Sequence, residues 1–226
     1  GVVARENGVD VCLLQEPLVR NGRVEGLPAG MSVFNNEWAA IVVDSKEMDV
    51  MCVEECTNEW GVCVRLDSKS GPMYVCTIYC KFNREIEPYL EYLERVIDCA
   101  KGRPLIVGMD ANAVSPIWHS KNVRDNGERE ERGNKLEQMI SEKELIVLNE
   151  PSEYYTFSGP NGESDIDVTL GNAALLKYEC SWELKIEWCE SDHNAMLIEI
   201  RPDEQKKINK KVTKNRWELK GADWEK

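Results

Sequence analysis

The chain has 226 residues and carries 28 Lys and Arg against 41 Asp and Glu, which gives a formal net charge of −13. Its apolar fraction of 42% is typical of a globular domain and excludes a disordered or fibrous chain. Because a protein that coats nucleic acid through charge alone would be basic, the composition also argues against generic DNA coating.

Hydrophobic alternation predicts eight strands, at residues 10–14, 39–43, 62–66, 73–79, 105–109, 146–148, 166–170 and 195–200. Helical spacing of apolar residues predicts two helices, over residues 86–100 and 133–144. Strands outnumber helices, and the two kinds interleave. This order favours a mixed α/β or α+β layered sandwich, in which sheets form the core and helices cover them.

The apolar pattern fades after residue 200. Residues 201–226 hold nine basic and five acidic side chains, while the rest of the chain is strongly acidic. We therefore divide the chain into a domain over residues 1–200 and a basic linker over residues 201–226. The alternatives for this segment are a solvated charged tail and a terminal helix docked through Trp217, Leu219 and Trp224.

No segment has the apolar length of a membrane span. The apolar run at residues 38–43 has the length of one strand, whereas a span needs roughly 18 apolar residues. The first residues also lack the basic and then apolar pattern of a signal peptide. We therefore expect a soluble intracellular protein with no membrane partner.

Nine cysteines are present, an odd number, and most lie in apolar or alternating segments. This indicates reduced thiols that pack as small hydrophobic groups. The alternative is a zinc site built from Cys52, Cys56, Cys76 and Cys80. It is disfavoured because both pairs have strand-like spacing, which puts side chains i and i+4 roughly 13 Å apart.

Acidic side chains occur where predicted strands end, which is where layered α/β proteins place their sites. Glu16 follows the first predicted strand, and Asp110 and Asn112 follow the fifth. Asp167 lies inside an apolar strand, where an unpaired charge is costly. It therefore needs a histidine, an arginine or a metal ion as its partner.

The sequence holds two histidines, of which His193 is the better candidate. It follows Asp192 and directly precedes the last predicted strand, whereas His119 lies in a loop with little around it to suggest a role. Glu, Asp-x-Asn, Asp and Asp-His, in this order, supply hard oxygen ligands and one imidazole. That set suits Mg²⁺ or Mn²⁺ better than zinc.

Six short motifs resemble, in order, those of the endonuclease/exonuclease/phosphatase superfamily, which includes apurinic endonucleases and DNase I. They are Gln15-Glu16, Tyr79, the Gly-Met-Asp-Ala-Asn of residues 108–112, the Tyr-Thr-Phe of residues 155–157, Ser164-x-x-Asp167 and Ser191-Asp192-His193. The resemblance spans residues 9–200, which is almost the whole predicted domain.

A further set of segments resembles the endonuclease domain of non-LTR retrotransposons, above all the insect elements that insert at fixed sites in ribosomal DNA or telomeric repeats. These segments are Asp110-Ala111-Asn112-Ala113, Ser115-Pro116-Ile117-Trp118, Arg132-Gly133-Asn134-Lys135-Leu136, Val147-Leu148-Asn149 and Ile166-Asp167-Val168-Thr169-Leu170. In such elements the domain precedes a reverse transcriptase. Asn215-Arg216-Trp217 and residues 222–226 resemble the connector between the two.

The resemblance implies a four-layer α/β sandwich like that of DNase I, with two packed β-sheets flanked by helices. It implies a divalent-metal-dependent endonuclease that acts on double-stranded DNA in the nucleus. The expected cofactor is Mg²⁺, with Mn²⁺ as the alternative. The nick would leave a 3′ hydroxyl for target-primed reverse transcription by the reverse transcriptase of the same polypeptide. The alternatives are an abasic-site repair endonuclease or a phosphatase of the same superfamily, and a DNA-binding module with a decayed site.

Residue roles are implied by the resemblance as well. The catalytic set is Asp110, Asn112, His193, Asp167, Tyr79 and Asp192, and the metal ligands are Glu16 and Asp192. Asp110 would orient or deprotonate the attacking water, and Asn112 would donate to the transition-state phosphate. His193, paired with Asp167, would contact the scissile phosphate, which Tyr79 would help to position.

Residues 155–164 predict a hairpin, because alternating ends flank Gly-Pro-Asn-Gly turn chemistry. In related retrotransposon nucleases the corresponding hairpin reaches into the DNA groove, and a basic run after the Asp-x-Asn motif suits phosphate contacts. The expected DNA-binding residues are Thr156, Ser158, Gly159, Pro160, Asn161, Gly162, Arg124 and Arg132. The alternative for the hairpin is an ordinary surface turn, and the alternative for the basic run is a solvated loop.

The sequence departs from the superfamily pattern in two places. The superfamily usually has a strand, carrying an Asn near the metal, before its first helix, whereas this sequence starts within that helix. Cys80-Lys81 follow Tyr79 at a position where proline is common, which leaves the shape of that loop open.

Overall fold

The structure is a computed structural model that describes residues 2–121, 123, 127–160 and 162–202. Its α-helices are α1 (Val2–Glu6), α2 (Glu87–Ala100) and α3 (Glu128–Glu142), and its 3-10 helices are η1 (Glu54–Cys56), η2 (Pro116–Trp118) and η3 (Ala173–Lys177). Its strands are β1 (Val11–Gln15), β2 (Val19–Arg20), β3 (Arg23–Val24), β4 (Ser32–Asn35), β5 (Ala39–Val43), β6 (Asp49–Cys52), β7 (Gly61–Ser68), β8 (Gly71–Tyr79), β9 (Leu105–Asp110), β10 (Ile146–Val147), β11 (Phe157–Gly159), β12 (Gly162–Ser164), β13 (Asp167–Gly171), β14 (Tyr178–Lys185) and β15 (Ala195–Pro202). Among the described residues, no helix combines the length and apolar character needed to cross a membrane.

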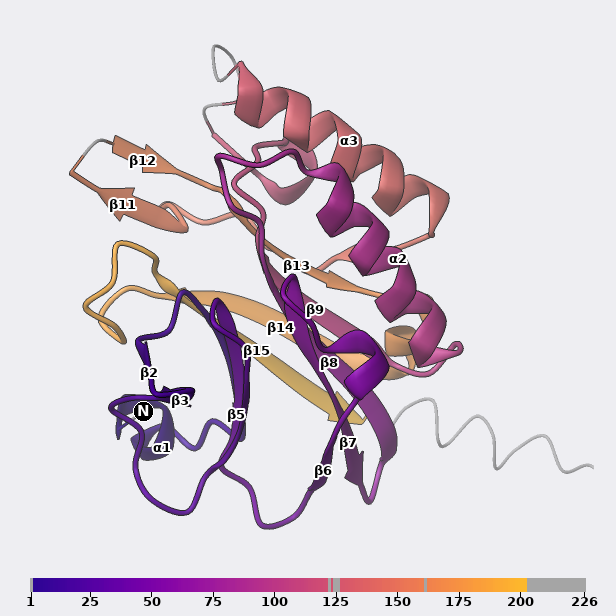
Figure 1. Ribbon diagram of the computed structural model, residues 1–226. Coiled ribbons are helices and arrows are strands. Elements are labelled where there is room, and N and C mark those ends of the chain that lie inside the picture. Colours follow the sequence, from indigo (N-terminus) through magenta and orange to yellow (C-terminus); the bar gives the residue numbers. More distant parts are fainter. Residues whose placement is uncertain (1, 122, 124–126, 161, 203–226) are drawn as a thin grey trace, which may run out of the picture.

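A six-stranded sheet of order β10-β13-β9-β8-β7-β6 forms the centre of the molecule. Its neighbouring strands are antiparallel except β8 and β9, which are parallel and are connected through α2. Helices α2 and α3 lie side by side over one face of this sheet (Figure 1). The main core fills the space between these helices and the sheet, because α2 turns an apolar stripe that includes Tyr89, Leu93 and Val96 toward the sheet.

The opposite face of the central sheet packs against a second layer of strands (Figure 1). This layer consists of a three-stranded sheet, β1-β5-β4, and the antiparallel pair β14-β15. Buried side chains of β5 meet those of β7 and β8 in a second core. The predicted sandwich of packed sheets flanked by helices is therefore confirmed, with its second strand layer divided into two parts.

One polar contact fixes how the two layers meet beside the strand ends. The Gln15 amide, at the end of β1, donates to the buried Thr77 hydroxyl of β8 at 2.8 Å. It also donates to the Gly108 carbonyl of β9 at 3.4 Å. These bonds bring Glu16, the next residue, to the ends of β8 and β9.

All eight predicted strands are confirmed, with ends that shift by at most two residues. The first predicted helix is confirmed as α2, whereas α3 starts at Glu128, five residues earlier than predicted. Its first turn contains three glutamates, which favour a helix N-terminus electrostatically but leave no apolar periodicity. The prediction omits β14, although its alternation of Tyr178, Cys180, Trp182 and Leu184 would have indicated a strand.

The cysteines are reduced except for one pair. Cys56 of η1 and Cys99 of α2 form a disulfide, so the prediction of reduced thiols is wrong for these two residues. The other seven cysteines are free. Within the described residues no cysteine belongs to a group that could hold a metal, so the alternative zinc site is not formed.

Gly133 of α3 provides a test of how closely this helix packs. A Cβ atom at position 133 would lie 2.0 Å from the Val114 carbonyl oxygen, which is backbone and cannot move aside cheaply. We expect Gly133→Ala to lower the free energy of unfolding by about 3 kcal/mol through this clash. Urea denaturation, with the exposed Ser141→Ala on the same helix as the control, measures the difference. Equal midpoints for both variants would contradict the close packing.

Candidate active site

Two buried aspartates and one histidine meet at one end of the central sheet. Asp110 ends β9 and Asp167 begins β13, and the two are direct cross-strand partners. Both carboxylates are nearly inaccessible to solvent. The His193 Nδ1 atom lies 3.0 Å from Asp167 Oδ2, and its Nε2 atom lies 3.8 Å from Asp110 Oδ2. The structure therefore brings together Asp110, Asp167 and His193, as the sequence predicted.

The loop that carries His193 is held by the base of the β11–β12 hairpin. The backbone N–H of Asn194 donates to the Thr156 carbonyl at 2.7 Å, and that of Ser158 donates to the Asp192 carbonyl at 2.7 Å. The Phe157 ring meets the imidazole edge-on, with centroids 5.0 Å apart. The imidazole is thus fixed from both sides before any ligand binds.

Burial and charge act in opposite directions on the protonation of this cluster. Burial by itself lowers the pKa of His193, but the hydrogen bond and charge of Asp167, together with the charges of Asp110 and Glu16, raise it to about 9. Burial, followed by the charge of Asp167, raises the pKa of Asp110 to about 7 despite the opposing effect of His193. The cluster therefore holds an imidazolium at neutral pH, next to a carboxyl group that can exchange its proton in this range.

Asn112 sits in a strained turn directly after Asp110. Its backbone is left-handed, with φ of 45°, and its N–H donates to the Asp110 carboxylate at 3.1 Å. Its side-chain amide donates to the Cys80 carbonyl at 3.2 Å. An amide carries two N–H bonds, so one remains to meet a ligand. Left-handed backbone in a residue other than glycine is uncommon and often occurs at functional sites.

Tyr79 and Glu16 extend the site along the same edge. Tyr79 ends β8 beside Asp110 in the parallel pair. Burial, followed by the interaction with the Glu16 carboxylate, raises the pKa of the Tyr79 hydroxyl, so the hydroxyl stays protonated. Glu16 also has left-handed backbone, with φ of 49°, and its N–H donates to the Trp38 carbonyl.

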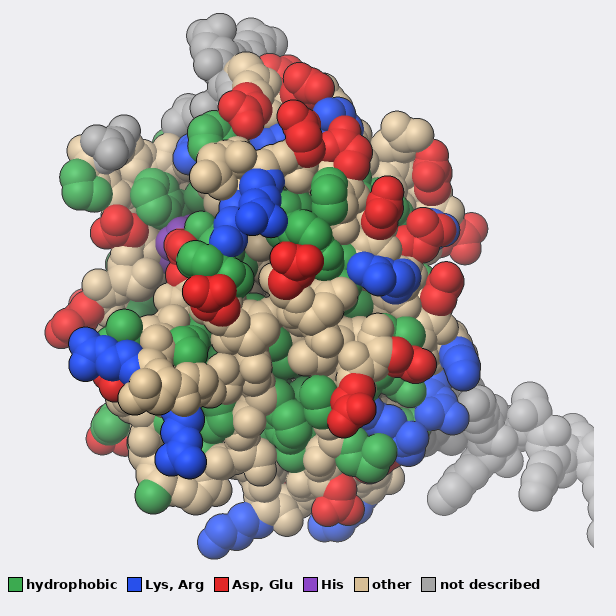
Figure 2. Space-filling view, in the orientation of Figure 1, with side chains coloured by type: hydrophobic (Ala, Val, Ile, Leu, Met, Phe, Trp, Pro, Cys, Tyr) green, Lys and Arg blue, Asp and Glu red, His purple; other side chains and the backbone are tan. Residues whose placement is uncertain are grey.

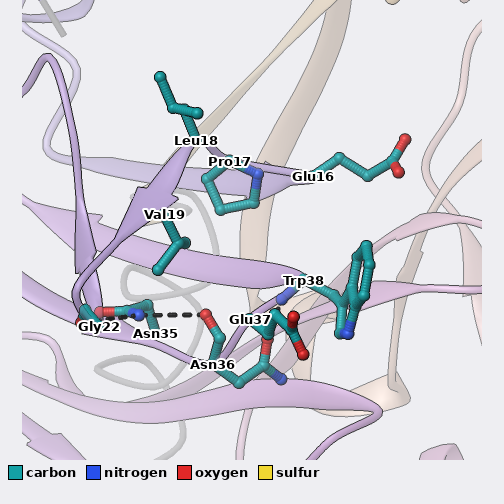
Figure 3. Close-up of a pocket in the computed structure, with 9 residues that line it drawn as sticks. All are labelled: Glu16, Pro17, Leu18, Val19, Gly22, Asn35, Asn36, Glu37 and Trp38. Carbon is teal, nitrogen blue, oxygen red and sulfur yellow. Dashed lines mark hydrogen bonds between the residues drawn. The ribbon is translucent and has the colours of Figure 1, made fainter.

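A hollow of about 800 Å³ opens next to Glu16. Figure 3 shows the Glu16 side chain extending away from Asn35 and Asn36, with Pro17, Leu18 and Trp38 around the same hollow. The group whose ligand atoms all lie within 4.8 Å of one another consists of Asp110, Asp167 and His193, among the residues that the structure describes. The predicted metal ligands Glu16 and Asp192 lie outside this group, and Asp192 is exposed.

The expected DNA-binding residues fall into different environments. The hairpin is confirmed as β11–β12, which projects from the body in Figure 1, and Ser158, Pro160 and Gly162 are exposed on it while Gly159 is half-buried. Thr156 is buried, and its hydroxyl accepts the backbone N–H groups of Ile166 and Asp167, so it positions the catalytic strand rather than contacting DNA. Asn161 and Arg124 lie outside the described residues.

The prediction that Arg132 lies on a phosphate-contacting rim is wrong. Its side chain is buried, and the guanidinium donates to the carbonyls of Asn112, Ala111, Cys80 and Arg84 at 2.6–3.4 Å. These acceptors belong to the loops that follow β8 and β9. Arg132 therefore ties α3 to the two loops that carry the site.

Two further polar residues support the site, and the sequence interpretation gave them no role. Buried Asp165 accepts the backbone N–H groups of Lys121 and Thr156 and so fixes the start of β13. Buried Asn149 donates to the Asp167 carbonyl at 3.0 Å and accepts the Thr169 N–H at 2.7 Å. The sequence offered one signal for such a supporting role: Asp165 is a polar residue directly before an apolar strand.

The fold defines the class of the protein as a DNase I-like sandwich with a carboxylate–imidazole cluster at one end of the central sheet, and comparisons with known proteins agree. A protein-family model described as "Endonuclease-reverse transcriptase" matches residues 73–197. The chain belongs to this family, as an apurinic-endonuclease-like endonuclease domain of the non-LTR retrotransposon type.

Individual relatives support the same assignment. The chain is 42% identical, over 90% of its length, to the "Retrovirus-related Pol polyprotein from type-1 retrotransposable element R1" of Bradysia coprophila. It spans about a fifth of the length of the curated relatives it matches. The solved "Endonuclease domain of TRAS1, a telomere-specific non-LTR retrotransposon" superposes with a TM-score of 0.77 and 30% identity, covering 89% of both chains.

A more distant structure shows the fold alone. The AP endonuclease LMAP from Leishmania major superposes with a TM-score of 0.66 over 89% of this chain and 81% of its own, at 12% identity.

The protonation of His193 can be measured directly. We expect its imidazole to titrate near pH 9 in metal-free protein, and Asp167→Asn to lower that value because the largest favourable partner is lost. NMR titration of the ring protons, with His119 as the second resonance, measures both. Because the folded-state pKa is raised, the pair stabilises the fold fully below about pH 6.5 and loses this contribution as the pH rises through about 9. An unchanged His193 titration in Asp167→Asn would contradict the pairing.

The tie made by Arg132 predicts a stability effect. Arg132→Lys keeps the charge but cannot reach four carbonyls, and we expect the free energy of unfolding to fall by about 3 kcal/mol. Exposed Arg103→Lys is the matched control in chemical denaturation. Indistinguishable stabilities of the two variants would show that the buried guanidinium is dispensable.

Proposed function

We propose that this domain cleaves one strand of double-stranded DNA by divalent-metal-dependent hydrolysis and leaves a 3′ hydroxyl end. The observation that carries the proposal is the cluster of Asp110, Asp167 and His193, held at one end of the sandwich with Asn112 and Tyr79 beside it. Hydrolysis of a phosphodiester needs an activated water, stabilisation of negative charge on phosphate, and stabilisation of the leaving 3′ oxygen. These residues supply groups suited to each need.

Asp110 is assigned to the attacking water, which it orients and deprotonates. A general base works best when its pKa is near the working pH, and burial raises the pKa of Asp110 to about 7. Asn112 donates its remaining amide N–H to the phosphate. The His193 imidazolium contacts the same phosphate, and Asp167 holds the ring through Nδ1 so that Nε2 faces the reacting group.

The donor set fits a hard divalent cation. Carboxylates and one imidazole line this end of the sheet, and Cys80, the nearby thiol, is buried with its pKa raised, so it stays protonated. Glu16, assisted by Asp192, would hold Mg²⁺ or Mn²⁺. When bound, the cation supplies positive charge next to the phosphate, which the acidic body lacks.

DNA approach is constrained by the distribution of acidic residues. Figure 2 shows acidic side chains gathered over α2 and α3, a face that repels phosphates. The β11–β12 hairpin projects from the body away from those helices (Figure 1). We assign the exposed hairpin residues Ser158, Pro160 and Gly162, with Asn161 and Gly159 between them, to DNA contacts near the cleaved bond, and we retain Arg124 as a phosphate contact.

The biological role follows from the family. A 3′ hydroxyl at a nick is the end that a polymerase extends, so a nick at the insertion site would prime reverse transcription in the nucleus. The matched relatives include a Pol polyprotein, which supports a reverse transcriptase in the same polypeptide. In this assignment residues 201–226 form the basic linker between the two, of which Arg201 and Pro202 still belong to β15 and residues 203–226 lie outside the described residues.

Nicking of supercoiled plasmid tests the proposal. We expect Mg²⁺-dependent conversion to open circles, abolished by EDTA and reduced at least about 100-fold by Asp110→Asn, because the base is lost. Asp49→Asn, an exposed aspartate on the edge strand β6, is the matched control and should nick at the wild-type rate. Extension of the nick by a DNA polymerase without end repair detects the 3′ hydroxyl.

Substrate choice separates the alternatives. An apurinic repair enzyme would cut a duplex with one abasic site far faster than an intact duplex, and a phosphatase would release phosphate from small esters while leaving the plasmid closed. Absence of metal-dependent nicking by the wild-type protein would refute the proposed function.

A further inference from the structure

A second hollow, of about 380 Å³, adjoins the hollow beside Glu16. We call it the Trp38–Trp60 pocket. It is lined by Asn36, Glu37, Trp38, Glu59, Trp60, Tyr79, Lys81, Arg84 and Tyr89. It shares Asn36, Glu37 and Trp38 with the hollow beside Glu16, so the two form neighbouring parts of one surface. Tyr79 connects the pocket to the catalytic cluster, because it lies beside Asp110 in the parallel register of β8 and β9.

Four of the nine residues that line the pocket are aromatic. The rings of Trp38 and Tyr79 are near parallel, with centroids 6.3 Å apart and an interplanar angle of 27°. Trp60 meets Tyr89 edge to face at 5.0 Å. Trp38, Trp60 and Tyr79 are half-buried and line the hollow, whereas Tyr89 is buried in the main core and supports Trp60. Such faces are the standard platforms for stacking nucleobases.

The three loops that carry these rings are fixed by side-chain hydrogen bonds. The Asn36 carboxamide oxygen accepts the N–H groups of Trp38 and Ala39, and its nitrogen donates to the Asn58 carbonyl. The Asn58 carboxamide oxygen in turn accepts the Trp60 N–H at 2.9 Å.

The third loop is held in the same way. The Lys81 N–H donates to the Tyr89 hydroxyl at 3.1 Å, and Arg132 donates to the Arg84 carbonyl at 2.6 Å. The pocket is therefore preformed, which lowers the entropy lost when a ligand binds.

The charged side chains around the pocket favour a neutral ligand over a phosphate. Lys81 Nζ lies 3.2 Å from the centre of the Trp38 ring, and the Arg84 guanidinium lies 5.8 Å from that of Trp60. Glu37 and Glu59 line the same pocket, so its two cations are balanced by two anions. A second phosphate would gain little there, whereas a neutral aromatic ring with a polar edge would meet stacking surfaces, cationic donors and carboxylate acceptors.

We infer that the Trp38–Trp60 pocket binds one nucleobase of the DNA strand next to the scissile phosphate, and so selects where the nick falls. This inference rests on the proposed function. The carboxylates of Glu37 and Glu59 can accept hydrogen bonds from exocyclic amino groups, which adenine, cytosine and guanine carry and thymine does not. The pocket therefore favours a base with an amino group over thymine.

The first experiment removes one base at a time around a mapped nick. A stacked base contributes enough that its replacement by an abasic residue at the bound position should slow wild-type nicking roughly tenfold. In Trp60→Ala the same replacement should have no effect, because the partner is already lost. Trp60→Phe should restore the position dependence, and Trp188→Ala, a tryptophan in the β14–β15 turn outside the pocket, should behave as wild type.

A second experiment does not depend on cleavage. In EDTA, we expect wild-type protein to bind single-stranded oligo(dA) and oligo(dC) more tightly than oligo(dT), and all three more tightly than an abasic chain of equal length. Lys81→Gln and Trp60→Ala should reduce these differences. If the differences appear but the wild type nicks no duplex, the proposed function fails and the pocket stands. If the wild type nicks DNA but neither experiment shows a base effect that depends on Trp60, the pocket assignment is overturned.

Discussion

Two like charges buried side by side constrain the whole site. The antiparallel register of β9 and β13 places Asp110 directly opposite Asp167, in a region that solvent hardly reaches. Such a pair is unstable unless a cation lies against it or a proton is retained. In this structure the His193 imidazole lies against both carboxylates. The two carboxylates raise the pKa of the imidazole to about 9. The hairpin base, the loop after β14 and the strand order all serve to keep this ring in place.

The surrounding backbone is organised by polar side chains that face inward. Arg132, Asn149 and Asp165 are buried, and each bonds to backbone groups of the segments that carry the cluster. A buried guanidinium that bonds only to carbonyls would be costly if any of its partners were lost. This arrangement makes the positions of Asn112 and of the loop after Tyr79 interdependent. Function therefore depends on residues that never touch the substrate.

The charge distribution suggests how an acidic protein can handle DNA. Acidic residues gather over α2 and α3, whereas the β11–β12 hairpin projects away from these helices. In the proposed function, attraction of the phosphate backbone is left to a few local cations and to a bound metal ion, and stacking in the Trp38–Trp60 pocket provides contact that needs no net positive charge. A nuclease built in this way would discriminate among sites more by fit than by electrostatic affinity.

The sequence by itself determined the strands, the main helices, the family and the three members of the central cluster, because strand ends in layered folds converge at one edge. It did not determine the environment of Thr156 and Arg132, which occur in polar segments yet are buried by packing against β13 and the site loops. It also did not indicate Asp165, Asn149 or the Trp38–Trp60 pocket. The hydrogen-bond partners of the Asp165 and Asn149 side chains lie 9 to 44 residues away along the chain, and no local periodicity encodes such contacts. Only the tertiary structure decides which polar groups face solvent and which hold the backbone together.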